Sequence, residues 1–369
     1  MSSIKIVDIA TANPPLKLTQ EEILNRILKS PLRSAREKKL YTKFLTEPSI
    51  RTRYVAIEDQ PEKLFEETQD EAIDRFQVQA TRLGAQAVKK LLRRTGLKPH
   101  DIDGIIITTC TGYLCPGLTS YISQAVGLRE DIYALDMVGT GCGAALPGMK
   151  SAWQYLTAHP DSRVIVLAVE ICTATSYWNE DLDLIISNSI FGDGAAACLL
   201  TNRGESAGLE IREFQSVLWP QYRDELRYVT RNGRLLNVLK KDVPSLAASA
   251  FHRIYQRLTK DFTVKIDRMA VHPGGRKILD EIEAISPFGG DALRRSRSVL
   301  ARYGNMSSPS VLYVLRDILH KDNCQSGETV GIFAFGAGMT AFGCLAVYRA
   351  AAVPDRSVNR KEVCDGAVV

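Results

Sequence analysis

The chain has 369 residues, of which 45% are hydrophobic, and its 47 Lys and Arg against 42 Asp and Glu give a net charge of +5. This length allows a large core and predicts either two domains or one large duplicated domain. The small net charge and the scattered basic residues, without interleaved aromatics, argue against a nucleic-acid partner.

The first half of the chain alternates strands with amphipathic helices. Thr19-Gln20-Glu21-Glu22 is a capping box that predicts a helix running to residue 28. A longer amphipathic helix is predicted over residues 76–94, ending at Gly96. Further strands are predicted at residues 104–110, 132–138, 164–169 and 195–200, and further helices at residues 118–126 and 144–157.

The second half begins after Asn202 and repeats this order. Ser308-Pro309 is typical of a helix start, with Ser as the N-cap and Pro as the first helical residue, and an apolar helix face follows. Strands alternating with buried helices predict an α/β fold with mostly parallel sheets. The other predicted elements are helices at residues 245–259 and 276–285 and strands at residues 266–271, 330–335 and 340–348.

The segment 331–347 is the longest apolar stretch. Gly336, Gly338, Thr340 and Gly343 interrupt it, so it predicts two strands joined by a tight turn and no membrane span. No N-terminal secretory pattern is visible, because residues 4–6 already resemble a strand.

The eight cysteines are dispersed, without the short paired spacings of a zinc site or the density of a secreted disulfide scaffold. We therefore expect no metal site and a reducing, cytoplasmic setting. Cys198 and Cys344 fall in apolar strands and are expected in the core. The full set is Cys110, Cys115, Cys142, Cys172, Cys198, Cys324, Cys344 and Cys364.

Cys142 is the candidate nucleophile. It follows a predicted strand and sits in Gly139-Thr140-Gly141-Cys142-Gly143, where the chain turns through glycines into a helix. Helix N-terminal amides favour a thiolate, and small neighbours let an acyl group approach the sulfur. Two other interpretations stay open. A free cysteine is often a small core residue, and Gly139-x-Gly141-x-x-Ala144 also fits a dinucleotide fingerprint, although Asp161 stands before the next strand and not at its end.

His272 and Asn305 suggest a Cys–His–Asn site together with Cys142. His272 begins His272-Pro273-Gly274-Gly275, and Asn305 lies in Tyr303-Gly304-Asn305-Met306-Ser307-Ser308. A histidine alone is more often a loop residue and an asparagine alone is more often a cap. These two segments, with Phe191-Gly192-Asp193-Gly194-Ala195, resemble the type III polyketide synthases, the chalcone synthase-like branch of the thiolase superfamily, in order and spacing across residues 4–348.

The resemblance implies a thiolase-like α/β fold of two pseudo-duplicated halves in a layered αβαβα architecture. The N-terminal half, residues 1–202, would carry Cys142, and the C-terminal half, residues 203–349, would carry His272 and Asn305. A polar tail, residues 350–369, would follow. A homodimer is the assembly that the family implies.

The same resemblance implies iterative decarboxylative condensation of malonyl-CoA onto an acyl-CoA starter. Cys142 would hold the acyl chain as a thioester, and His272 would stabilise the thiolate. His272 and Asn305 would also donate hydrogen bonds to the enolate oxygen. Phe191 would be the aromatic gatekeeper that favours loss of carbon dioxide. The CoA thioesters are substrates, so no further cofactor is expected.

Several positions depart from the plant members and bear on the starter. Asn237 aligns with a second aromatic gatekeeper, Cys110 and Cys172 with cavity threonines, and Cys115 with a methionine that crosses the dimer interface. The last turn, Ala334-Phe335-Gly336-Ala337-Gly338, lacks the family's proline but keeps Gly336 and Gly338. These smaller side chains predict room for an aliphatic starter, including a fatty acyl group, and a pyrone, resorcinol or phloroglucinol-type product, with malonyl-CoA alone as the main alternative starter.

Basic residues supply candidates for the phosphates of CoA. Lys43 is the best match, in a helix-like stretch whose other cations are Arg33, Arg36, Lys38 and Lys39, and Arg276 and Lys277 form a second pair. A solvated helix face explains such a stretch equally well. Two other functions remain as alternatives. One is a β-ketoacyl carrier-protein synthase III-like enzyme that condenses once, and the other is a dinucleotide-binding protein that uses the loop from Gly139 to Ala144.

Overall fold

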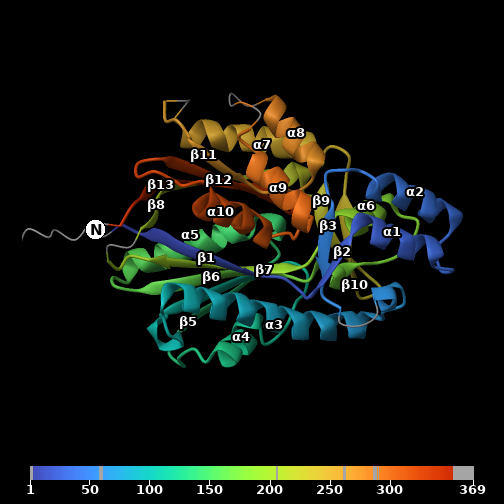
Figure 1. The fold of residues 1–369 in the computed structure, drawn as a ribbon, viewed down its shortest axis with the longest axis horizontal. Helices are drawn as coiled ribbons and strands as arrows, with labels where there is room; N and C mark the ends of the chain where they lie inside the picture. The colour runs from blue at the N-terminus through green and yellow to red at the C-terminus, as the bar shows by residue number, and fades with distance from the viewer. Residues whose placement is uncertain are drawn as a thin grey trace, which may run out of the picture.

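The computed structural model describes residues 3–57, 61–204, 207–260, 263–285, 289 and 291–351. These residues form a layered α/β structure in which helices alternate with the two halves of one mixed sheet (Figure 1). The expected polar tail lies outside the described residues from residue 352 onward.

One nine-stranded sheet contains both halves, in the order β11-β12-β13-β8-β1-β7-β6-β4-β5. The two halves meet at a short antiparallel ladder in which Lys5 of β1 faces Glu210 of β8 and Ile6 faces Leu209. The first half consists of β1 (Lys5–Ala12), β4 (Gly104–Thr109), β5 (Tyr133–Val138), β6 (Arg163–Glu170) and β7 (Gly194–Thr201). The second consists of β8 (Gly208–Leu218), β11 (Arg268–Val271), β12 (Thr329–Gly336) and β13 (Thr340–Arg349).

The expectation of mostly parallel sheets is wrong. β4 runs parallel to β5 and β6, and β11 runs parallel to β12. The other neighbouring strands of this sheet are antiparallel, including the pairs β6–β7, β1–β7 and β12–β13. The reason is visible at β12 and β13, which are joined by a tight turn, and a tight turn can only reverse the chain.

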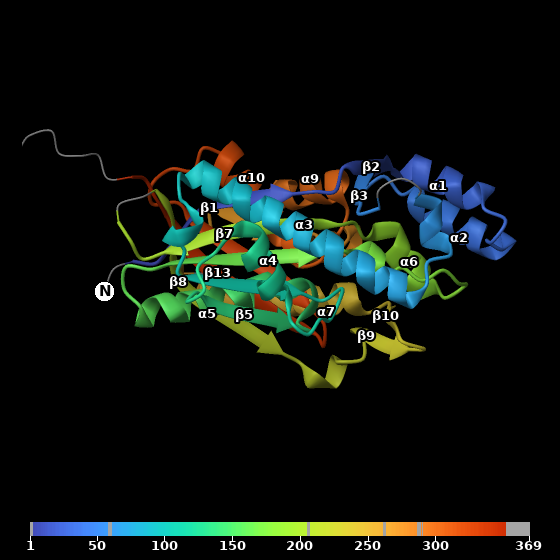
Figure 2. The same ribbon diagram turned by 90° about the horizontal axis from the view of Figure 1, so that it is seen from below.

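The helices form three layers around the two half-sheets. α3 (Gln69–Thr95) and α4 (Leu118–Val126) cover the outer face of the first half, and Figure 2 shows α3 running along it. α5 (Ala145–Ala158) and α10 (Pro309–Lys321) lie in the middle and contact both halves. α7 (Val243–Leu258) covers the outer face of the second half, with α8 (Arg276–Ala284) packed on it and α9 (Arg294–Tyr303) beside α10. The result is the predicted αβαβα layering (Figure 1).

A smaller set of elements gathers at one end of the layers, on the right in Figure 1. Its core contains Leu24, Ile27, Tyr41, Leu45 and Ile185. The elements are α1 (Gln20–Lys29), α2 (Ala35–Leu45), α6 (Leu182–Ile190), the pair β2 (Leu16–Thr19) and β3 (Thr52–Val55), and the pair β9 (Leu226–Arg231) and β10 (Arg234–Leu239). Short 3-10 turns complete the fold: η1 (Pro61–Phe65), η2 (Pro99–Asp101), η3 (Gly141–Gly143), η4 (Cys172–Thr175) and η5 (Pro220–Tyr222).

Local sequence signals explain several helix ends. The Thr19 side chain accepts a hydrogen bond from Glu22 N, and the Glu22 carboxylate accepts one from Thr19 N, so the predicted capping box is confirmed. α3 ends as predicted at Gly96, which has a φ of 71°. α3 begins at Gln69, earlier than the predicted residue 76, because Thr68 and Glu71 form a second capping box at its start.

The start of α10 differs from its prediction in one respect. Pro309 occupies the first turn as expected, but the Ser308 side chain makes no capping hydrogen bond. Its hydroxyl donates instead to Oε1 of Glu170 at 2.6 Å. Ser308 therefore ties the helix start to the end of β6.

Candidate active site

Cys142 lies in the turn between β5 and α5. Gly139 and Gly141 have φ angles of 91° and 68°, a region that glycine adopts readily. η3 then leads the chain into α5, so Cys142 lies just before the helix N-terminus, where the aligned peptide dipoles favour negative charge. The Cys142 side chain keeps some accessible surface. The turn therefore presents the sulfur at a position that an acyl group can reach.

Gly336 and Gly338 lie in the second half of the sheet, against the Cys142 turn. A Cβ atom on Gly336 would lie 2.2 Å from the carbonyl oxygen of Thr140 and 3.2 Å from Gly143 N. Gly338 has a φ of 71°, and a Cβ atom there would meet nothing within 4 Å. Gly336 is thus needed for the close approach of the two halves, and Gly338 for the backbone conformation of the turn.

His272 follows β11 directly. Its backbone N–H donates to the carbonyl of Phe333 at 2.8 Å, which extends the pairing of β11 with β12 by one residue. The side chain is 2% exposed. Among the described residues, its Nδ1 has no hydrogen-bond partner. A buried ring nitrogen with no fixed partner is free to serve a bound substrate or a neighbouring group.

Asn305 links the His272 loop to the start of α10. Its Nδ2 donates to the carbonyl of Gly274 at 3.0 Å, and its Oδ1 accepts from Ser307 N at 2.8 Å. The side chain is 3% exposed. These bonds fix the orientation of the amide, and the acceptor of its Nδ2, the Gly274 carbonyl, belongs to the loop that carries His272.

Burial sets the protonation states of the free site. The pKa of the Cys142 thiol is raised to about 11, chiefly by burial, although hydrogen bonds with Ser307 and Asn305 lower it. Burial also lowers the pKa of His272 to about 3. The free enzyme at neutral pH therefore holds a thiol and a neutral imidazole. The hydrogen bond with Asn305 also shows that the structure brings Cys142 and Asn305 together.

The buried carboxylate of Glu170 fixes backbone groups that lie next to the site. Oε2 of Glu170 accepts hydrogen bonds from Cys110 N at 2.9 Å and Thr111 N at 3.1 Å, and burial raises the pKa of this carboxyl. The Cys110 thiol lies 3.1 Å from the Ser307 hydroxyl. Cys110 thus lies next to Ser307, whose hydroxyl lowers the pKa of Cys142, the candidate nucleophile.

Phe191 lies directly beside Asn305. The two residues form an isolated parallel bridge, and Gly192 N donates to the carbonyl of Asn305 at 3.0 Å. Arg53 holds the other side of this segment, because its guanidinium donates to the carbonyls of Phe191 at 2.6 Å and Asn188 at 2.7 Å. The backbone of Phe191, the predicted gatekeeper, is therefore fixed beside the backbone of Asn305, the predicted catalytic amide.

The remaining predicted cavity residues separate into two groups. Phe191, Cys172 and Asn237 line one pocket, together with Tyr228. Cys115 is exposed and does not line that pocket. In a single chain, Cys115 thus lies on the surface, and its predicted role across a dimer interface stays a prediction.

The predicted CoA-binding residues lie on the molecular surface. Lys43 is in the last turn of α2, and Arg276 and Lys277 begin α8. Nε of Arg276 pairs with Oε1 of Glu47 at 3.0 Å, so the end of α2 and the start of α8 are neighbours. Of the other cations of this stretch, Arg33 is paired with Glu37 and largely buried. Lys43, Arg276 and Lys277 thus form a basic rim on the surface, where the end of α2 meets the start of α8.

Sequence reasoning missed Tyr228, Ser307 and Glu170. Ser307 lies within the Asn305 motif without a signal of its own, and Glu170 simply ends an apolar strand. Tyr228 had a usable signal: Asn232-Gly233 between two short apolar runs is typical of a hairpin turn. The structure confirms such a turn between β9 and β10, with φ angles of 50° and 76°, and Tyr228 pairs there with Asn237.

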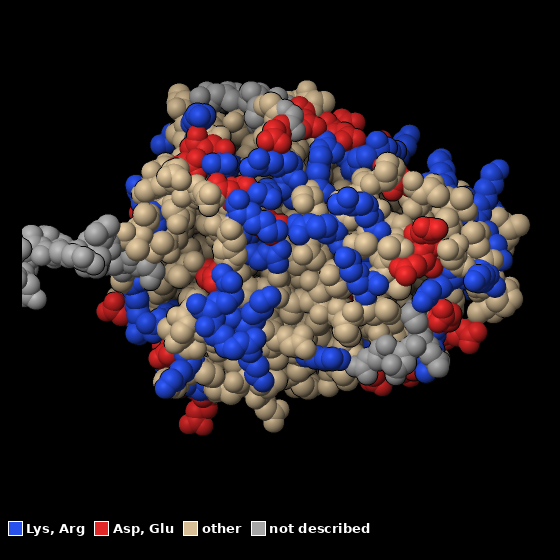
Figure 3. All heavy atoms as spheres, viewed as in Figure 1, with Lys and Arg blue, Asp and Glu red and all other residues tan. Residues whose placement is uncertain are grey.

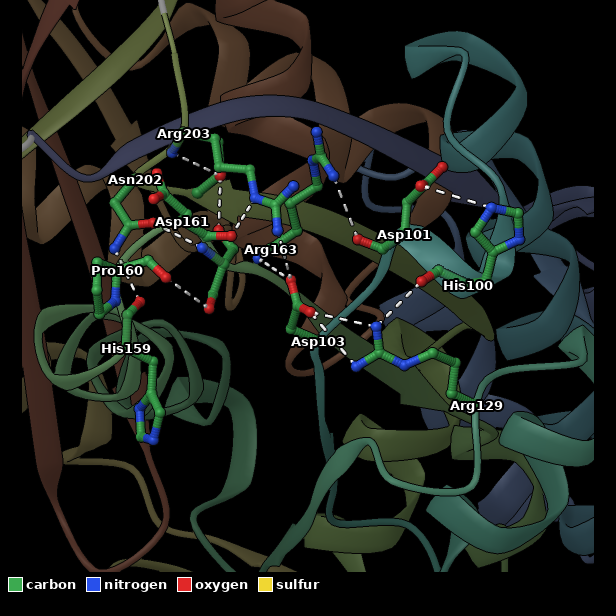
Figure 4. Close-up of polar contacts among 12 residues, drawn as sticks. His100, Asp101, Asp103, Arg129, His159, Pro160, Asp161, Arg163, Asn202 and Arg203 are labelled. Atoms are coloured by element: carbon green, nitrogen blue, oxygen red, sulfur yellow. Dashed lines mark hydrogen bonds and ion pairs between the residues drawn. The ribbon is translucent and has the colours of Figure 1, made fainter.

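The structure removes support from the dinucleotide interpretation of the Cys142 loop. Figure 4 shows Asp161 in the turn before β6, where its main-chain carbonyl accepts from Arg203. Asp103 nearby accepts from Arg163 N at 2.8 Å and from Arg129. This network lies at the beginning of β4 and β6, whereas Cys142 follows the end of β5, which is parallel to β4. An acidic ribose ligand would have to lie at that other end. The carboxylate there, Glu170 at the end of β6, is fully buried and accepts hydrogen bonds from Cys110 N, Thr111 N and the Ser308 hydroxyl, so it does not offer itself to a ribose.

No helix within the described ranges is both long and apolar enough to cross a membrane. Nor does any group of three or more His, Cys, Asp or Glu side chains gather there as metal ligands.

Comparisons with known proteins agree with this geometry. Residues 5–258 match the family model of FAE1/type III polyketide synthase-like proteins, and residues 211–348 match the C-terminal domain of chalcone and stilbene synthases. The chain is 27% identical to 3,5-dihydroxyphenylacetyl-CoA synthase of Streptomyces toyocaensis, over 91% of this chain and 88% of that protein. It is also 27% identical to the alpha-pyrone synthesis polyketide synthase-like Pks18 of Mycobacterium tuberculosis, over 92% and 90%.

Solved structures show the same fold. PKS-I from the brown alga Ectocarpus siliculosus superposes with a TM-score of 0.87 at 25% identity, covering 94% of this chain and 98% of that one. The matches confirm the predicted type III resemblance and thiolase-like fold, and they favour iterative condensation over the single-condensation and dinucleotide alternatives. The chain therefore belongs to the type III polyketide synthase family and is a condensing acyltransferase.

Proposed function

We propose that this enzyme extends an aliphatic acyl-CoA starter with several malonyl-CoA units and cyclises the product to a pyrone, resorcinol or phloroglucinol-type ring. The observation that carries the proposal is the convergence of the Cys142 turn with Asn305, whose Nδ2 is held on the His272 loop. Alpha-pyrone synthesis in the name of one relative fits a pyrone product. The CoA thioesters are the only small molecules that this chemistry needs, so we propose no further cofactor.

The proposed chemistry begins with a proton transfer. Burial opposes a lone thiolate and a lone imidazolium, but moving the Cys142 proton to His272 creates both charges together, so each stabilises the other. The thiolate attacks the carbonyl of the starter, CoA leaves as a thiol with that proton, and Cys142 becomes acylated.

Extension then uses the hydrogen-bond donors of His272 and Asn305. Malonyl-CoA loses carbon dioxide, and its remaining electrons form an enolate whose oxygen accepts hydrogen bonds from His272 and Asn305. The enolate carbon attacks the thioester on Cys142, and the Cys142 thiolate leaves. Phe191, beside Asn305, provides an apolar surface that disfavours the malonyl carboxylate and so favours its loss. Lys43, Arg276 and Lys277 would hold the CoA phosphates at the rim.

Incubation with malonyl-CoA and a panel of acyl-CoA starters tests the proposal, with products identified by mass spectrometry. We expect products that carry two or more malonyl-derived units, and Cys142→Ala as the control should give none. Products with a single extension would instead assign the enzyme to the single-condensation class. Activity confined to malonyl-CoA would exclude the aliphatic starter.

We also propose a homodimer that forms along β5. This strand is the last in the sheet, and it exposes Tyr133 by 38% and Val138 by 47%. Tyr113, 74% exposed, lies two residues before the exposed Cys115. An apolar strand edge of this kind favours pairing with another chain. Light scattering after size-exclusion chromatography tests the assembly, and Val138→Lys should shift the enzyme toward a monomer.

A cytoplasmic location and the lack of a nucleic-acid partner complete the proposal. The seven described cysteines are all free, which fits a reducing compartment. Lys and Arg gather on the face drawn in Figure 3. Several cations of the described residues are paired with acids: Arg294 and Arg295 contact Asp322, and Arg302 contacts Asp317. These ion pairs offset part of the positive charge, which argues against a continuous basic patch for nucleic acid.

A further inference from the structure

The C-terminal end of α6 is held by residues from other parts of the chain. The last carbonyl groups of a helix have no partners within it, so other groups must satisfy them. The guanidinium of Arg53 on β3 donates from Nη1 to the carbonyls of Asn188 at 2.7 Å and Phe191 at 2.6 Å. Nε2 of Gln20, at the start of α1, donates to the carbonyl of Ser189 at 2.9 Å. A cation such as Arg53 is also favoured at this end of the helix dipole.

Asn305 supplies the remaining bond to this helix end. Its backbone N–H donates to the carbonyl of Ile190 at 2.9 Å, between the carbonyls that Gln20 and Arg53 hold. Its own carbonyl accepts from Gly192 N at 3.0 Å, so the backbone of Asn305 is bonded on both sides to the segment that Arg53 fixes. The position of the Asn305 side chain therefore depends on where the end of α6 lies.

The Arg53 side chain also packs against the residue before Asn305. Gly304 has a φ of 67°, and a Cβ atom there would lie 2.9 Å from Cγ and Cδ of Arg53 and 2.6 Å from the carbonyl oxygen of Ile190. Glycine allows this close approach because it has no side chain. Arg53 thus contacts the Asn305 turn through its aliphatic stem and the end of α6 through its guanidinium.

The charge of Arg53 is buried. The residue is 4% exposed, and burial lowers its pKa to about 10, although the charge of Asp193 opposes this shift, so Arg53 is still a cation at neutral pH. The acceptors named above are uncharged, and so is Oε1 of Gln20, which accepts from Nε of Arg53 at 2.9 Å. Burying a cation among neutral acceptors is costly, so stability alone does not explain its presence. A guanidinium is, however, a rigid planar fork that fixes several acceptors in one geometry.

We propose that Arg53 is a positioning residue for malonyl decarboxylation, because it fixes the backbones of Asn305 and Phe191 relative to each other. The inference rests on the proposed function, since it takes the Asn305 amide as a donor to the enolate oxygen. The proposed reaction contains one step that uses this donor and one that does not. Decarboxylation needs Asn305, whereas transfer of the starter onto Cys142 needs the thiolate.

Arg53→Lys tests the proposal, because lysine keeps the charge but has no fork that can hold both carbonyls. Release of labelled carbon dioxide from malonyl-CoA should slow by up to about 10²-fold, the scale of loss that a misplacement of about 1 Å causes. Acylation of Cys142 by a starter acyl-CoA, followed by mass spectrometry of the intact protein, should change far less. A smaller folded fraction would instead lower both rates in equal measure.

Arg75→Lys is the matched control. The Arg75 side chain is only 10% exposed and also donates to backbone carbonyls, those of Ala56 and Thr173. Within the described residues, its bonds go to Glu67, the loop after β3 and η4, and not to the end of α6. This variant therefore measures what the loss of a largely buried guanidinium does by itself.

Two further variants keep the proposal testable. Gln20→Ala removes the acceptor of Arg53 Nε and the donor to Ser189. It should cause a smaller selective loss of carbon dioxide release, and it replaces Arg53→Lys if that variant does not fold. In an Asn305→Ala background, Arg53→Lys should slow this release by a smaller factor than it does alone, since its effect passes through Asn305.

The outcomes separate the inference from the proposed function. The positioning role would be overturned, with condensation still standing, if Arg53→Lys slowed acylation and decarboxylation equally or acted no differently from Arg75→Lys. Parental carbon dioxide release in Gln20→Ala, where Arg53→Lys does not fold, or fully multiplicative effects of Arg53→Lys and Asn305→Ala would contradict it as well. Parental release in Asn305→Ala, or failure of the parent enzyme to condense malonyl-CoA with any starter, would instead remove the proposed function.

Discussion

His272→Gln should make the protein less sensitive to acid. Burial lowers the folded-state pKa of His272 to about 3, whereas an unfolded histidine titrates near 6.5. Below pH 6.5 the unfolded chain binds a proton that the folded protein does not, so the free energy of unfolding falls as the pH drops toward 3. At pH 5 the difference is about 1.5 pH units, which corresponds to about 2 kcal/mol. Glutamine has a similar size and no charge to gain, so the variant lacks this loss.

Equilibrium unfolding in urea at pH 7.5 and pH 5 measures the effect. The carboxylates that titrate in the same range are common to parent and variant, so the difference between the two pH-dependent losses isolates His272. We expect the parent to lose about 2 kcal/mol more than the variant. Equal losses would show that His272 is not held neutral by burial. A parent that gains stability relative to the variant at pH 5 would indicate a raised pKa, as in a resting thiolate–imidazolium pair, and would refute the neutral resting state described above.

Three further sets of variants test the rest of the site. Cys142→Ala should abolish polyketide formation and change the unfolding free energy, measured by denaturant unfolding, by no more than about 1 kcal/mol. Cys198 is a buried strand residue, so Cys198→Ala should keep polyketide formation and lower the unfolding free energy. Asn305→Ala should slow release of labelled carbon dioxide from malonyl-CoA by about 10²–10³-fold, and adding His272→Ala should cost less than the product of the two single effects, since both donors serve one oxygen; unchanged release in both single variants would contradict their roles. Gly336→Ala should lower both turnover and thermal stability, because its Cβ would lie 2.2 Å from the Thr140 carbonyl, whereas Gly338→Ala should lower stability alone, by about 1–2 kcal/mol.

The parts of the site that depend on local sequence could be predicted. The glycines around Cys142 require positive φ angles, and a strand followed by a helix leaves few other ways to arrange them. Pro309 marks the start of α10 for an equally local reason, so Asn305 could be assigned to the preceding loop. The assignment of His272 and Asn305 to the same site depended on the family resemblance.

The pocket could not be predicted in the same way. Its walls come from β2, β3, η1, α6 and two hairpin strands, and contacts between such distant segments leave no periodic trace in the sequence. The hairpin itself was within reach, through Asn232-Gly233. Knowing the turn would also have predicted that Tyr228 and Asn237 face each other, since a two-residue turn sets the register of its strands.

Ser308 shows why a correct local signal can still give the wrong contact. As an N-cap its hydroxyl would contribute about 1 kcal/mol to the start of α10. Glu170, however, is fully buried, and a carboxylate in that position without donors would lose considerably more than one hydrogen bond. Its Oε2 is satisfied from the end of β4, and Ser308 is the donor to Oε1. The larger penalty decides where the Ser308 hydroxyl points. Its hydrogen bond to Glu170 anchors α10, the helix that follows Asn305, to the end of β6. The same carboxylate also accepts the hydrogen bond from Cys110 N.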